Sequence, residues 1–107
     1  DLPKEEERKE IFKIHLQGFR PNSWDAFDYF KLAQLSESFS GAEIKQSIIE
    51  AMYLAFYEER EFTTEDICCA LKQIIPLANL ESSQMTKLQN WALSGQIRLA
   101  SSKNIYI

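Results

Sequence analysis

Glycine, histidine and cysteine are scarce in this sequence of 107 residues, and each shortage excludes a kind of site. A phosphate-binding loop requires a Gly-x-x-x-x-Gly-Lys-Ser/Thr run, whereas the three glycines, Gly18, Gly41 and Gly95, lie far apart. The sequence also lacks an apolar strand that ends in acidic residues and could hold magnesium. We therefore expect no nucleotide hydrolysis from these residues alone, so this segment by itself is not expected to be an enzyme.

Metal ligands are equally few. Zinc sites need several Cys or His ligands, and the sequence offers one histidine and the adjacent pair Cys68 and Cys69. Neighbouring side chains on a helix point about 100° apart, which disfavours a shared metal or a disulfide between the two. We predict buried or half-buried free thiols and no metal site.

Long apolar runs and basic clusters are missing as well. No run approaches the ~20 apolar residues that span a bilayer, and no charged-then-apolar leader opens the chain. Twelve Lys and Arg stand against sixteen Asp and Glu, for a formal charge of -4, and the basic residues are scattered. Nucleic-acid binding needs a concentrated cationic surface. We expect a soluble intracellular domain that binds neither a membrane nor nucleic acid.

The sequence does contain helical periodicity. Residues 1–17 include three consecutive glutamates, which suit the positive end of a helix dipole. Gly18 suits a left-handed cap at the end of this helix. Ile11, Ile14 and His15 fall on one of its faces. The first predicted helix therefore ends near Gly18.

A shorter second helix is predicted over residues 28–36, with Asp28 as its N-cap. The loop before it, residues 19–27, is rich in turn-forming residues, and Trp24 is expected to fold back onto the core as an apolar anchor. The side chains expected to be buried in the helix are Leu32, Ala33 and Leu35.

Two capping boxes mark the starts of the next two helices. In the first box, Ser40 can accept from the backbone N–H of Glu43, whose side chain can reach back to the backbone of Ser40. Thr63 and Asp66 repeat this chemistry, and Pro76 ends the helix that follows. The apolar stripe of the first helix comprises Ile44, Ile48, Ile49, Met52, Tyr53, Ala55 and Phe56. That of the second comprises Ile67, Ala70, Leu71 and Ile74.

The aromatic residues are assigned to the core because no basic residues interleave with them, as single-strand nucleic-acid binders require. Those concerned are Phe12, Tyr53, Phe56 and Tyr57. Residues 82–93 form a further amphipathic segment, and residues 96–107 lose the helical period, which indicates a mobile or partner-docked tail. The predicted class is all-α, a small bundle of about four helices with an extra C-terminal helix and tail.

Four stretches then follow one another in a fixed order. They are Asp1-Leu2-Pro3, residues 7–15, residues 32–44, and Thr64-Glu65-Asp66 with Ala70. In that order they resemble the lid, the small helical subdomain of AAA+ ATPases such as the FtsH, katanin and valosin-containing protein groups. Residues 7–16 and 39–44 look similar to an AAA group of cyanobacteria and algal plastids. The resemblance implies a lid over residues 1–77 and an extension over residues 78–107, packed on or beside it.

The resemblance also implies a nucleotide site. In the family, the adenine and ribose of ATP or ADP lie in the crevice between a large α/β subdomain and the lid, while the absent core binds magnesium. Ile11, His15, Gly41 and Ala42 match the positions on the lid side. The chemistry is suitable because Gly41 lets the backbone approach closely and Ala42 leaves room for a flat ring. Ile11 offers an apolar wall, and His15 can stack or donate a hydrogen bond.

Each of these residues also has a plainer interpretation. A lone histidine on an amphipathic helix is usually half-buried without a ligand, and Gly41 and Ala42 are ordinary small residues after an N-cap. Many AAA+ clades place an arginine where Gly41-Ala42 stands, so the nucleotide state would be read through rigid-body rotation of the lid. The family usually has glycine in place of Ser38, where a left-handed backbone would strain serine by roughly 1 kcal/mol.

The implied partners are the lid's own large subdomain and the neighbouring subunits of a ring, a hexamer, in an ATP-dependent remodeller of the cytoplasm or plastid stroma. A rival hypothesis is a stand-alone helical protein–protein interaction module with its own groove. A helix-turn-helix DNA reader is a weaker third, since the sequence supplies no basic face. The lid hypothesis predicts that Ile11, His15, Gly41 and Ala42 cluster on one exposed, unusually apolar surface.

Overall fold

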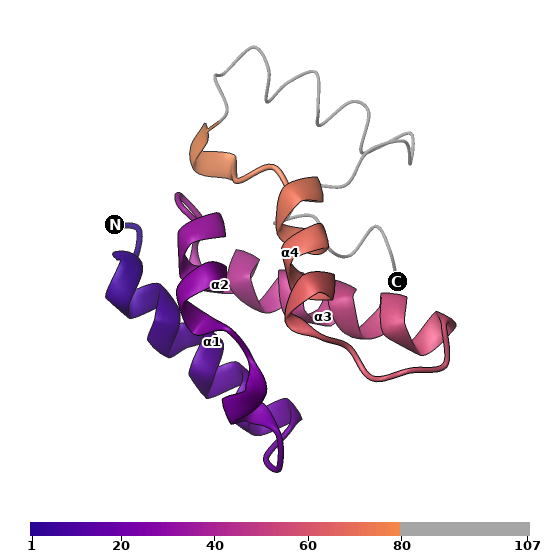
Figure 1. Ribbon diagram of the computed structural model, residues 1–107. Coiled ribbons are helices and arrows are strands. Elements are labelled where there is room, and N and C mark those ends of the chain that lie inside the picture. Colours follow the sequence, from indigo (N-terminus) through magenta and orange to yellow (C-terminus); the bar gives the residue numbers. More distant parts are fainter. Residues whose placement is uncertain (80–107) are drawn as a thin grey trace, which may run out of the picture.

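The computed structural model describes residues 1–79, and four α-helices account for most of them. The helices are α1 (Glu5–Phe19), α2 (Tyr29–Leu35), α3 (Gly41–Tyr57) and α4 (Thr64–Gln73), with short 3-10 turns at η1 (Trp24–Ala26) and η2 (Leu77–Asn79) (Figure 1). The predicted all-α bundle of about four helices is confirmed. The helix expected at residues 82–93 and the tail at residues 96–107 lie outside the described residues.

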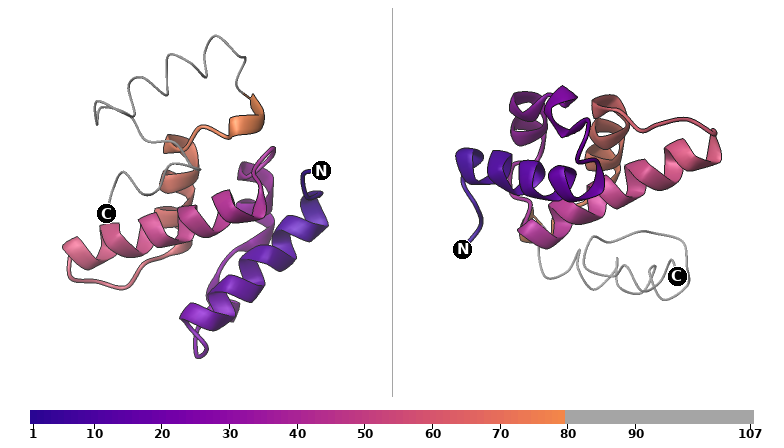
Figure 2. Two further views of the ribbon diagram at one scale, coloured as in Figure 1. Left: turned by 180° about the vertical axis from the view of Figure 1, so that it is seen from behind. Right: turned by 90° about the horizontal axis from the view of Figure 1, so that it is seen from below.

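Each of the four helices packs against two of the others, so they form a ring with the core inside it. Helix α3 packs against both α1 and α4, while α2 packs against α1 and α4 from the other side (Figures 1 and 2). Trp24 is half-buried against the core, as expected of an apolar anchor. The buried core of the described part comprises Phe12, Leu16, Leu32, Phe39, Ile44, Ile48, Ala51, Ala55, Phe62, Ile67, Cys68, Leu71 and Ile74.

The predicted helix starts are confirmed by their hydrogen bonds. The Asp28 carboxylate accepts from the backbone N–H of Lys31 at 3.1 Å. Ser40 Oγ accepts from the N–H of Glu43 at 3.2 Å, and Glu43 Oε1 accepts from the N–H of Ser40 at 2.8 Å. At α4 the Asp66 carboxylate accepts from the N–H of Thr63 at 2.8 Å. Each contact joins residues three positions apart, which is why local sequence predicts it.

Two buried polar groups connect distant segments. Arg8, which is 7% exposed, donates to the carbonyl of Ala33 from Nε and Nη2, to Ser36 Oγ, and to the carbonyl of Pro3. The second carboxylate oxygen of Glu43 accepts from the backbone N–H of Leu77 at 3.1 Å. Arg8 therefore joins α1 to the end of α2, and Glu43 joins the start of α3 to the segment after α4.

Left-handed backbone occurs at Ser38 and Glu59, with φ of 73° and 57°. Ser38 thus has the left-handed backbone that the family's usual glycine would adopt, and serine bears the strain. Glu59 belongs to the C-terminal cap of α3, where its N–H donates to the carbonyl of Phe56 at 3.0 Å and the N–H of Arg60 donates to that of Ala55 at 3.1 Å. This pair of bonds is the Schellman motif, in which glycine is the usual left-handed residue.

The prediction that Gly18 caps the first helix is wrong. Gly18 lies inside α1, which continues to Phe19, and the N–H of Arg20 donates to the carbonyl of Leu16 at 2.7 Å. Phe19 packs partly buried against the core. That contact offsets the roughly 1 kcal/mol that glycine costs within a helix.

Several apolar residues lie on the surface, and one of them, Leu35, was predicted to be buried. Helix α1 buries Phe12 and Leu16, which leaves Ile14 exposed on another face, and Leu35 of α2 is exposed too. Cys68 is buried as expected, but Cys69 is exposed. Neighbouring side chains point about 100° apart on a helix, so Cys68 and Cys69 cannot both face the core.

Of the four aromatic residues predicted to be in the core, only Phe12 is fully buried. Tyr53, Phe56 and Tyr57 are exposed, because the last turns of α3 project beyond α1 and α2 (Figures 1 and 2). In this part of α3 the buried positions are occupied by the small residues Ala51 and Ala55. The periodicity is therefore correct, but the buried face is narrower than the apolar stripe.

Candidate functional site

Helix α1 passes close to the first turn of α3. A Cβ added to Gly41 would lie 3.9 Å from Ile11 Cδ1, so only a hydrogen atom on Gly41 faces that side chain. Ser40 fixes the first turn by capping it, and Ala42 is exposed at the second helical position. At this junction the side chain of Ile11 on α1 therefore faces the backbone of α3 at Gly41.

His15 lies one turn further along α1 than Ile11, and Lys45 lies one turn further along α3 than Gly41. Burial lowers the pKa of the half-buried His15 below its ordinary 6.5, and the positive charge of Lys45 lowers this pKa further. At neutral pH the ring is therefore mostly uncharged. A neutral imidazole carries one donor and one acceptor nitrogen, so it can form hydrogen bonds of both kinds.

The predicted site residues occupy one region of the surface. The structure brings Ile11 and Gly41 into proximity, and it places His15 and Ala42 one turn and one residue away from them. Exposed Ile14 lies three positions after Ile11 on α1 and adds apolar surface. Contact of these residues with a nucleotide remains a prediction.

Sequence reasoning missed Lys45. The sequence shows that Lys45 follows Gly41 by four residues, just as His15 follows Ile11 by four. These pairs become neighbours only because α1 and α3 are in contact, which the sequence does not show. Lys45 is exposed, and no carboxylate partner is found for it among residues 1–79. Within residues 1–79 it therefore contributes a positive charge beside His15 that no described carboxylate pairs with.

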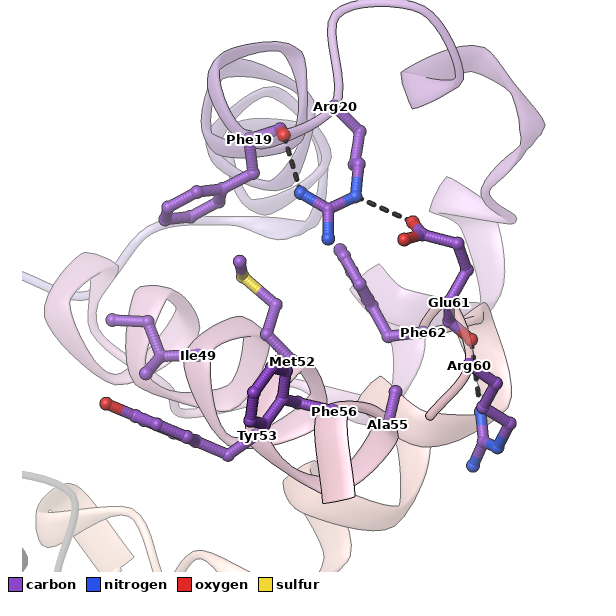
Figure 3. Close-up of a pocket in the computed structure, with 10 residues that line it drawn as sticks. All are labelled: Phe19, Arg20, Ile49, Met52, Tyr53, Ala55, Phe56, Arg60, Glu61 and Phe62. Carbon is purple, nitrogen blue, oxygen red and sulfur yellow. Dashed lines mark hydrogen bonds and ion pairs between the residues drawn. The ribbon is translucent and has the colours of Figure 1, made fainter. Parts of the chain in front are cut away.

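A second surface lies at the other end of α3. A groove of about 490 Å³ runs between the end of α1, the second half of α3 and the loop that follows it (Figure 3). Arg20 Nε and Glu61 Oε1 form an ion pair across its edge at 2.7 Å. The residues that line it are Phe19, Arg20, Ile49, Met52, Tyr53, Ala55, Phe56, Arg60, Glu61 and Phe62.

Neither a cluster of metal ligands nor a membrane-spanning helix is found in residues 1–79. No group of three or more His, Cys, Asp or Glu side chains in this range is arranged to hold a metal ion. No helix in the same part of the chain is long and apolar enough to cross a membrane.

Comparison with known proteins points to one family. The chain is 78% identical over 107 residues to the AAA domain-containing protein ycf46 of Trieres chinensis, a match that covers 100% of this chain and 22% of that protein. It is 54% identical over 101 residues to the ycf46 protein of Gracilaria tenuistipitata, covering 94% and 21%. A proteasome-activating nucleotidase of Sulfurisphaera tokodaii is 40% identical over 74 residues, covering 68% and 18%.

The chain thus spans about a fifth of the length of these curated relatives. No protein-family model matches the sequence, and no solved structure matches it.

Proposed function

The chain is a segment of an AAA-domain protein, and on this premise we propose that it forms the helical lid of a nucleotide site. In this proposal Ile11, His15, Gly41 and Ala42 face the adenine and ribose of ATP or ADP. The observation that supports it most is the proximity of Ile11 to Gly41, which joins two predicted site residues 30 positions apart in sequence across the α1–α3 junction.

Each residue has a distinct task in binding. Gly41 lacks a Cβ, so the edge of a flat base can approach the backbone of α3. Ile11 covers one face of the base with apolar surface. His15, uncharged at neutral pH, stacks or hydrogen-bonds without adding charge of its own. Ala42 keeps the mouth of the crevice open.

These side chains bind and orient the nucleotide but do not cleave it. Magnesium would supply charge stabilisation at the phosphates, and we assign its ligands to the large subdomain of the longer protein. ATP hydrolysis by that protein, its assembly into a ring, and its location in the plastid stroma or the cytoplasm are parts of the same proposal. The lid would transmit the nucleotide state to the neighbouring subunit by rotating as a rigid body.

The test uses the longer protein that contains this lid. Ala42→Leu places an uncharged, bulky side chain in the crevice, and we expect it to weaken ADP binding by about tenfold or more, the effect of roughly 1.4 kcal/mol. Ala26→Leu is the matched control, because Ala26 is also an exposed alanine but lies on η1. Equal ADP affinity in both variants, measured by isothermal titration calorimetry, would contradict the site.

A further inference from the structure

The groove at the C-terminal half of α3 is not used by the proposed nucleotide site. Gly41 and Ala42 open this helix, whereas Tyr53 and Phe56 lie in its last turns, roughly 20 Å further along the helix axis. The groove therefore needs a separate explanation, and the identity of its occupant does not depend on the nucleotide proposal.

The walls of the groove are mainly apolar. Phe19, Met52 and Phe62 line its interior, while Tyr53 and Phe56 stand at its rim (Figure 3). Four large side chains in the last turns of α3 are unusually exposed: Tyr53 62%, Leu54 41%, Phe56 78% and Tyr57 84%. Contiguous exposed apolar surface beside a concave feature is typical of a protein-binding site.

The charges beside the groove are arranged in favour of a cationic partner. Arg60 is neutralised by Glu58 at 2.8 Å and by Asp66 at 2.7 Å, and Arg20 is neutralised by Glu61 at 2.7 Å. Glu59 is exposed, has a left-handed backbone set by the helix cap, and lines an adjoining hollow together with Phe56, Arg60 and Glu61. The groove itself is lined by Arg20, Arg60 and Glu61, and Glu58, Glu59 and Asp66 lie beside it. This lip of six residues carries four carboxylates against two guanidinium groups, so it is acidic overall.

The acidic lip also argues against a second copy of this chain as the occupant. A symmetric dimer formed through this face would bring the same patch of both subunits together. Glu59 and its neighbours would then oppose their own copies, and like charges at short range repel. Charge complementarity instead favours lysine or arginine on the partner.

We propose that this groove binds an amphipathic helical segment of another protein, with apolar side chains entering between Phe19, Met52 and Phe56 and with lysine or arginine flanking them. In such a complex the apolar side chains provide most of the binding free energy. The basic residues face Glu59 and its neighbours, which sets the orientation of the segment and raises its association rate.

The test uses the full 107-residue chain and two synthetic helical peptides. One peptide consists of leucine and lysine, and the other has the same leucine positions with glutamate in place of lysine. We expect the lysine peptide alone to bind, with amide chemical shift changes in ¹⁵N-labelled protein concentrated at Phe19, Met52, Phe56 and Phe62. Equal binding of both peptides, binding of neither, or shift changes confined to other helices would overturn the proposal.

Matched variants distinguish binding at this groove from nonspecific binding to other exposed apolar residues. Phe56→Ser should weaken binding of the lysine peptide by about tenfold, as truncation of an apolar anchor does. Phe30→Ser is the control, because Phe30 is 56% exposed but lies on α2, away from the groove. Similar losses in both variants would contradict the assignment, as would a dimer of the chain in sedimentation that Phe56→Ser dissociates.

Charge is tested in the same way. Glu59→Lys should weaken binding several-fold more than Glu37→Lys, which makes the same change at an exposed position before α3. Equal effects of the two substitutions would show attraction to the net charge of the chain alone and would remove the assigned role of the lip.

Discussion

The two ends of α3 differ in what they leave exposed. The first turn presents Gly41 beside the side chain of Ile11 and leaves Ala42 exposed, while the last turns present tyrosine, leucine and phenylalanine to solvent. Small residues leave room for a small flat ligand, and large aromatic residues offer area to a polypeptide. One helix thus carries two surfaces of different chemistry, separated by a core that both share.

The largest expected effect sharpens this comparison at the level of stability. Ile44, at the start of α3, is fully buried. Ile44→Ala should therefore lower the free energy of unfolding by about 3 kcal/mol through lost contacts and a new cavity. Phe56→Ala at the other end should change it by less than about 0.5 kcal/mol, because that side chain is exposed. Urea denaturation of both variants measures the difference, and similar losses would show that the aromatic end is part of the core.

A middle-sized effect concerns the loop after α3. Hydrogen bonds from Arg60, chiefly, and from Thr63 hold the pKa of Asp66 below its ordinary 3.8, although burial acts in the opposite direction. The ionised carboxylate therefore stabilises the fold above the ordinary pKa, and this stability is lost as pH falls through the lowered value. Asp66→Asn should cost about 2 kcal/mol at pH 7.

The pH dependence gives that prediction its check. Urea unfolding of the unmodified chain and of Asp66→Asn should give stabilities that converge as pH falls from about 5 toward 2, because the native carboxylate becomes protonated. Glu65→Gln, which removes only an exposed ion pair with Lys31, is the control and should change little. If the free energies of unfolding of the unmodified chain and of Asp66→Asn differ by the same amount at every pH, this role of Asp66 is contradicted.

The smallest effect lies at the end of α1 that borders the groove. Gly18 sits inside the helix, and a Cβ added there would meet no atom within 4 Å, so Gly18→Ala should raise the free energy of unfolding by roughly 0.5–1 kcal/mol. Thermal unfolding followed by circular dichroism measures the gain. A loss of stability would show that α1 ends before Gly18, as its sequence signal alone suggests.

Local signals were sufficient to predict much of this fold. The N-caps Asp28 and Ser40 act within three residues of themselves, and the stripe from Ile67 to Ile74 is buried as its spacing predicts. These features depend on neighbours in sequence, so the sequence contains the information needed to find them.

The rest depends on contacts between distant segments. Arg8 pairs with Ala33 and Ser36, which lie 25 and 28 positions away, so nothing near Arg8 distinguishes it from a surface residue. The exposure of Phe56 depends on where α1 and α2 stop covering α3, and periodicity carries no such information. Ile11, His15, Gly41 and Ala42 were predicted as site residues from the resemblance to a family and not from local patterns. The likeness to the FtsH and katanin groups within that family stays a prediction.

The most direct test of the account combines both ends of α3 in one measurement, the affinity of the longer AAA-domain protein for ADP. Ala42→Leu should weaken ADP binding by about tenfold, while Phe56→Ser and the control Ala26→Leu should leave it unchanged. Unchanged ADP affinity in Ala42→Leu, or an equal loss in Phe56→Ser, would contradict the division of α3 into a nucleotide-facing end and a protein-facing end.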